Sequence, residues 1–173
     1  LSVCALFPPS IAAQSICAAA KIELGQEAAL EREGFTATLS MTNNLADQAL
    51  TGVRIELVVK DAEGAASESL FFANVTSLEG TSAIDGTGTI QPSGTATTRW
   101  LIIPSPGAGG TAASGVRYTV QARMSMLTSG VPRVITTFPV AITVKPQPLL
   151  QLEYVLPFEV FGNEPLTEVV EST

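Results

Sequence analysis

The two cysteines of this 173-residue chain, Cys4 and Cys17, are its most reactive side chains. Their spacing is far from the C-x-x-C of metal and redox sites, and the chain contains no histidine that could complete a zinc site. We therefore predict a disulfide between them, with two buried free thiols as the alternative. Such a bond would stabilise the fold by roughly 3 kcal/mol. It would also imply an oxidising compartment.

The remaining residues give little indication of a catalytic site. Without histidine the chain lacks the usual general base and the usual partner of a serine or cysteine nucleophile. A glycosidase would need two carboxylates across a cleft, roughly 5 to 9 Å apart. Nothing in the positions of Glu23, Glu56 and Glu153 suggests such a pair. We predict no catalytic residue, no cofactor and no enzymatic activity.

Four acidic residues, Asp61, Glu63, Glu79 and Asp85, fall in predicted turns, where calcium often bridges tandem modules. Their spacing matches no calcium-binding loop, so we predict no metal site. The tripeptide Asn74-Val75-Thr76 is a glycosylation sequon at the predicted end of a strand. Glycosylation of Asn74 is expected if the chain is a secreted eukaryotic protein.

The charge and the hydropathy of the chain exclude two classes of partner. Sixteen acidic and nine basic residues give a net charge of −7, spread along the chain, which argues against binding to nucleic acid. No apolar stretch reaches the roughly 18 residues of a membrane span, so we predict no membrane insertion. The apolar opening segment lacks a basic region and is not expected to be a signal peptide, so we expect the chain to begin inside a longer protein.

The elements that must position these residues are strands. Period-two alternation is clearest in a hairpin whose strands, 116–127 and 131–144, flank Thr128-Ser129-Gly130. Pro139 cannot donate a ladder hydrogen bond, so its strand should lie at a sheet edge or bulge near Phe138. The only helix candidate, 27–33, is short and ends at Gly34. The further predicted strands cover 17–24, 35–42, 53–60, 69–75, 82–90 and 95–103.

These strands divide the chain into three parts. We predict that residues 1–17 form a disulfide-closed segment, that 18–145 form a β-sandwich, and that 146–173 form a linker and the opening strand of a next module. Trp100, the only tryptophan, is predicted to lie in the core. The apolar side chains of the tail have no partner strand left in the sequence. We expect them to make inter-module contacts: Leu150, Leu152, Tyr154, Phe158 and Phe161.

Two stretches resemble a known family. TLSMTNN (38–44) and TGVRIELVVKDAEG (51–64) look like the second and third strands of immunoglobulin-like and fibronectin-III-like modules of large extracellular proteins. Tyr118 resembles the tyrosine at the sheet corner of such modules, and Val120 stands where antibodies have a cysteine. The segment PLLQLEYVLPFEVFGNEPLTEVVES (148–172) is similar to junctions in giant repeat proteins of bacterial and algal surfaces, such as mastigoneme-like filament glycoproteins.

The resemblance implies an all-β, immunoglobulin-like antiparallel β-sandwich of about seven strands, with an extra C-terminal strand that reaches a neighbouring module. It further implies a structural repeat unit of an extracellular filament, surface layer or adhesin, at the cell surface. The partners would be neighbouring modules or copies of the same chain. One alternative is a carbohydrate-binding or accessory module of a secreted protein. Another is donor-strand exchange, with residues 149–161 inserted into a neighbour.

Overall fold

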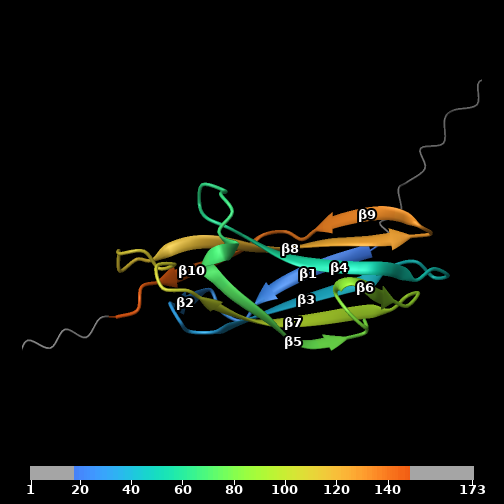
Figure 1. Ribbon diagram of the computed structural model, residues 1–173, viewed down its shortest axis with the longest axis horizontal. Coiled ribbons are helices and arrows are strands. Elements are labelled where there is room, and N and C mark those ends of the chain that lie inside the picture. Colours follow the sequence, from blue (N-terminus) through green and yellow to red (C-terminus); the bar gives the residue numbers. More distant parts are fainter. Residues whose placement is uncertain (1–17, 149–173) are drawn as a thin grey trace, which may run out of the picture.

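The computed structural model of the chain describes residues 18–148, which form a two-layer β-sandwich (Figure 1). The first sheet has the strand order β1-β3-β7-β5 and the second has the order β2-β10-β8-β4-β6, with β9 paired to the second half of β8. A single 3-10 turn, η1 (Glu68–Leu70), precedes β5. The strands are β1 (Ala18–Leu24), β2 (Ala28–Leu30), β3 (Phe35–Asn43), β4 (Leu50–Lys60), β5 (Phe71–Glu79), β6 (Asp85–Ile90), β7 (Thr95–Pro104), β8 (Val116–Thr128), β9 (Val131–Thr136) and β10 (Val140–Lys145).

The layout of the strands is that of an immunoglobulin-like sandwich. One sheet of that fold holds strands A, B, E and D and the other holds C, F and G. Here β1, β3, β7 and β5 take the places of the first set, and β4, β8 and β10 take those of the second. All pairings are antiparallel except that of β2 with β10. The predicted fold class is confirmed, although the described residues contain ten strands rather than about seven.

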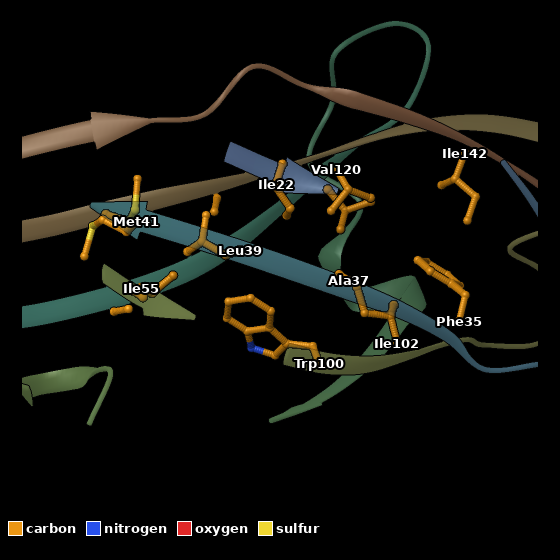
Figure 2. Close-up of a cluster of buried hydrophobic side chains, with 14 of the residues drawn as sticks. Ile22, Phe35, Ala37, Leu39, Met41, Ile55, Trp100, Ile102, Val120 and Ile142 are labelled. Carbon is orange, nitrogen blue, oxygen red and sulfur yellow. The ribbon is translucent and has the colours of Figure 1, made fainter. Parts of the chain in front are cut away.

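The core lies between the sheets and follows from the alternation in the sequence. Along β3 and β8 every second side chain is buried, because neighbouring residues of a strand point to opposite faces. Trp100 is 4% exposed and projects between the sheets, as predicted (Figure 2). Residues that line the same core from both sheets include Ile22, Phe35, Leu39, Met41, Ile55, Ile102, Val120 and Ile142.

Tyr118 forms the sheet corner that the resemblance implies. Its hydroxyl donates a hydrogen bond to the Ala108 carbonyl at 2.8 Å, and its ring meets that of Phe71 edge to face, with 4.9 Å between centroids. Val120 is fully buried two residues further on. The long loop before β8 is therefore anchored to the core by one buried hydroxyl.

The predicted strand 131–144 is in fact two strands. Pro139 has no N–H, and the chain leaves the ladder at Thr137, whose N–H donates to the Ala122 carbonyl at 2.9 Å. The Thr137 hydroxyl accepts from the Ala122 N–H at 2.9 Å, and Phe138 is turned outward, 91% exposed. The prediction of an edge strand holds for β9 only, because β2 covers the end of β10.

The stretch 27–33 is not a helix. Ala28, Ala29 and Leu30 instead pair in parallel with the last residues of β10, and the chain turns at Arg32, which has φ of 63°. Its good helix formers are overridden because three residues of strand complete the second sheet, whereas a single helical turn would gain little.

The chain enters and leaves the sandwich at opposite ends (Figure 1). Ala18 pairs with Asn43 at the end where β3 finishes, which we name the entry end. Lys145 pairs with Leu30 at the other end, beside the start of β8, which we name the exit end.

Candidate interaction sites at the two ends and the free edge

Glu31 ties together the segments that meet at the exit end. One of its carboxylate oxygens, Oε1, accepts hydrogen bonds from the backbone N–H groups of Gly107 and Gly109, both at 2.8 Å. The Glu31 N–H donates to the Lys145 carbonyl at 3.0 Å. A single residue thus joins the turn after β2, the glycine-rich loop 105–115 and the last residue of β10.

The glycine-rich loop packs directly on the exit of the chain. A Cβ at Gly109 would lie 2.3 Å from the Pro146 nitrogen, and a Cβ at Gly115 would lie 2.3 Å from the Val144 carbonyl oxygen. Such approaches exclude any side chain. Because Tyr118 also anchors this loop through Ala108, the exit direction of the chain is fixed by backbone contacts and by one buried hydroxyl.

Asn43 plays the corresponding part at the entry end. It is fully buried, and its Nδ2 donates to the carbonyls of Gln48 at 2.7 Å and Gln91 at 3.0 Å. Its Oδ1 accepts from the Leu45 N–H at 3.0 Å. The side chain therefore holds the loop after β3 against the turn between β6 and β7.

The outer edge of β9 is a free sheet edge. Within residues 18–148 no strand pairs with it. Thr137 and Ala122 form a hydrogen-bonded pair, and bonded and non-bonded pairs alternate from there along β8 and β9. Val134 and Thr136 fall in non-bonded pairs, so their N–H and C=O groups point away from β8. Pro132 presents only its carbonyl there. The exposed apolar side chains of this region are Leu127 (39%), Val131 (50%), Val134 (56%) and Phe138 (91%).

A groove continues this edge. It has a volume of about 400 Å³ and lies between edge strand β1 and the first residues of β10, where Val140 and Ala141 extend beyond the reach of β2. An adjoining hollow of about 460 Å³ is lined by Glu27, Arg117 and Thr143 as well as Val140 and Ala141. Both are open, and neither collects a set of catalytic groups.

The other exposed apolar group lies on β5 and β7: Phe72 (63%), Val75 (37%), Leu78 (37%) and Leu101 (38%). Asn74 is exposed among them, opposite Leu101. It does not sit where a strand runs into a turn, because β5 continues to Glu79 across a bulge at Thr76. Its side chain is accessible, and its glycosylation stays a prediction.

Two of the four carboxylates predicted in turns, Asp61 and Asp85, accept local hydrogen bonds, whereas Glu79 lies in β5 and pairs with Arg99. Asp61 accepts from the Ala65 N–H at 2.8 Å. Asp85 accepts from the hydroxyl and the N–H of Thr87, and these bonds hold the pKa of Asp85 below its ordinary value. Among residues 18–148, no three His, Cys, Asp or Glu side chains are grouped to hold a metal ion.

Several predicted sites lie outside the described residues: Cys4, Cys17, Leu150, Leu152, Tyr154, Phe158 and Phe161. The exposed aromatic residues that are described are Phe72, on β5 of the first sheet, and Phe138, between β9 and β10 of the second, so they form no common platform for a sugar ring. The carbohydrate-binding alternative stays a prediction. Within 18–148 no helix is long and apolar enough to span a membrane.

Sequence reasoning missed Glu31, Asn43 and Phe138 as residues of interest. The signal for Glu31 was weak, because a carboxylate and glycine N–H groups 76 and 78 residues away share no pattern. For Phe138 the signal was present, since an aromatic residue directly before a proline that breaks a strand has no regular ladder position.

Comparison with known proteins shows no family for this chain. No family model matches the chain, and no curated protein matches it. Among solved structures, the periplasmic chaperone SfaE is 17% identical, with a TM-score of 0.41 over 76% of this chain and 61% of its own. A PapD-like domain of human CEP192 is 12% identical, with a TM-score of 0.41 over 87% and 99% of the two chains. BcpA, the major pilin subunit of Bacillus cereus, is 13% identical, with a TM-score of 0.38 over 75% and 40%.

This chain thus spans less than two thirds of the SfaE chain. At these identities the likeness concerns the fold alone.

Proposed function

We propose that this chain is a structural module that joins end to end with copies of itself or with neighbouring modules, at the cell surface. The observation that carries the proposal is the position of the two ends: Ala18 and Lys145 lie at opposite ends of the sandwich. Domains often have their termini close together, which suits insertion into another fold. Termini at opposite ends suit a chain of modules in series.

The contacts that Glu31, Gly109 and Gly115 make at the exit end, which we name the exit clamp, support the same role. A spacer works only if the direction of its linker is defined, and Glu31, Gly109 and Gly115 fix the backbone at Lys145 and Pro146. The proline-punctuated linker that follows is stiff as well. A pull between the two ends would run along the strands, so that it loads the ladders of β1 and β10 in shear rather than opening them pair by pair.

Small-angle X-ray scattering of the full 173-residue chain over a concentration series tests this proposal. The 13 residues of β8 span about 43 Å, and with its loops one module should be about 50 Å long. End-to-end joining predicts that the largest dimension grows in steps of about this length while the cross-section stays constant. Growth of the cross-section instead, or a monomer at every concentration, would contradict it.

A further inference from the structure

The charges of this chain are segregated along its length. Residues 86–152 contain five basic residues and no acidic one, so the acids are not spread as the sequence analysis expected. The following stretch, 153–173, contains five acidic residues and no basic one. The basic residues lie on β7 to β10: Arg99, Arg117, Arg123, Arg133 and Lys145. The acidic ones are Glu153, Glu159, Glu164, Glu168 and Glu171.

The free edge of β9 lies within the basic stretch and close to the entry end. Val131 follows the turn at Ser129-Gly130, where both residues have positive φ, and Leu127 pairs with β4 at Thr51 beside the entry-end loops. Two amide N–H groups and three carbonyls are turned outward between Pro132 and Thr136. Exposed edges of this kind are templates for another strand, and natural sandwiches usually block them.

Among the described residues, the strand position next to β9 and β10, which we call the row of β2, is unoccupied over a defined length. β2 occupies that row only next to Thr143, Val144 and Lys145. Among the described residues nothing fills the row along 131–142, a stretch of twelve positions. The tail segment 149–161 has thirteen residues, and before Pro157 its apolar residues Leu150, Leu152, Tyr154 and Leu156 recur at every second position, which is typical of a strand.

We infer that segment 149–161 of one copy adds as a strand to the β9 edge of the next copy. The inference rests on the proposed end-to-end joining and names the surfaces that make the joint. The tail leaves one module at its exit end and meets the entry end of its neighbour. Running inward from there it would lie parallel to β9 and continue the row of β2, which is already parallel to β10.

The side chains of the two partners match. On β9, Val134 lies on the outer face with Pro132 and Leu127, whereas Arg133 lies on the other face, opposite Met126. A strand at 149–161 would place Leu150, Leu152 and Tyr154 on one face, and Glu153 on the other. The apolar face of the tail then covers Val134 and Leu127, and Glu153 faces Arg133. Main-chain hydrogen bonds would supply the affinity, and this pairing of side chains would set the register between the tail and β9.

Sedimentation velocity of the full chain, with charge-reversed variants, tests the inference. Arg133→Glu and Glu153→Arg should each weaken self-association about tenfold, since reversing one charge turns attraction into repulsion. The double variant Arg133→Glu/Glu153→Arg should return to within about threefold of the original chain. Arg99→Glu is the matched control, because this exposed arginine lies on β7 in the other sheet and should have no effect on self-association. Thermal unfolding of each variant checks that it folds.

A second variant tests whether the β9 edge itself takes part in self-association. Val134→Lys places a charge on the outer face of β9, where the residue is already 56% exposed, and should abolish association without lowering stability. Association that survives both Arg133→Glu and Val134→Lys would overturn this pairing but leave end-to-end joining standing. A chain that is monomeric at every concentration, for example because residues 1–17 or its own tail fill the row, would overturn both.

Discussion

Replacing Asn43 with alanine is expected to lower the free energy of unfolding by about 3 kcal/mol. The side chain is fully buried at the entry end and makes three hydrogen bonds of 3.0 Å or less, to Gln48, Gln91 and Leu45. Each such bond contributes about 1 kcal/mol net, and alanine leaves two carbonyls and one N–H without their partner. No compensating contact is available, because alanine can neither donate nor accept there.

Thermal and urea unfolding of the Asn43→Ala variant measure this loss. For a domain of this size the entropy of unfolding is about 0.3 kcal/mol/K, so the melting temperature should fall by about 10 °C. The urea midpoint should fall with an unchanged slope. Asn74→Ala is the matched control, because Asn74 is exposed on β5, and it should change stability by less than about 0.5 kcal/mol.

The Asn43→Asp variant sharpens the test. Its carboxylate keeps the acceptor for Leu45 but turns a charge toward the carbonyls of Gln48 and Gln91. Burial would raise the pKa of this carboxyl, so the variant should be less stable than Asn43→Ala at pH 7. It should recover relative to Asn43→Ala as the pH falls toward the ordinary aspartate pKa. A loss below about 1 kcal/mol for Asn43→Ala would refute the reasoning that this side chain holds the entry end.

Three further predictions concern the exit end and the N-terminal segment. Gly109→Ala should lower the free energy of unfolding by about 1 to 3 kcal/mol in a urea titration, since its Cβ would lie 2.3 Å from the Pro146 nitrogen. Gly25→Ala is the control and should be close to neutral in the same assay, because the nearest atom to its Cβ would be 3.5 Å away. Tyr118→Phe should cost about 1 to 1.5 kcal/mol at neutral pH by urea unfolding. Burial raises the pKa of Tyr118 above its ordinary 10.0, so the stability that the original chain has below pH 10 is lost as the pH rises through the raised pKa. Tyr118→Phe has no hydroxyl to ionise and should lose less stability over the same pH range. An equal alkaline loss in both proteins would contradict this. Alkylation of the denatured, unreduced chain followed by mass measurement should label neither Cys4 nor Cys17, and labelling of both would exclude the disulfide.

The sequence predicts the sandwich well because burial on one face of a strand leaves a period-two pattern. Along β3 and β8 the buried residues are those that the alternation indicates. The strand β2 could not be predicted, because Ala28, Ala29 and Leu30 carry helix propensity and become a strand only through β10, more than 110 residues away. Pro139 indicated an edge strand or a bulge near Phe138, but the division of the predicted strand 131–144 into the edge strand β9 and the inner strand β10 depends on where β2 lies.

The candidate sites were less accessible to sequence reasoning than the fold. A pair of cysteines, a sequon and an apolar tail are visible as local patterns, whereas the exit clamp joins Glu31 to glycines far along the chain through backbone N–H groups. For the free edge of β9 the only local signal was Pro139, which indicated an edge strand or a bulge without saying which residues would be free. The exposure of this edge follows from the absence of a neighbouring strand within residues 18–148, which is a property of topology rather than of the hairpin sequence.

Electron microscopy of the assembled full chain tests the central claim of end-to-end joining most directly. End-to-end joining predicts linear particles one module wide, with an axial repeat of about 50 Å set by the length of β8 and its loops. In Val134→Lys samples at the same concentration only single modules should be seen, because a charge on the outer face of β9 should abolish association. Particles that widen by lateral packing, or that remain single modules in the original chain, would contradict it.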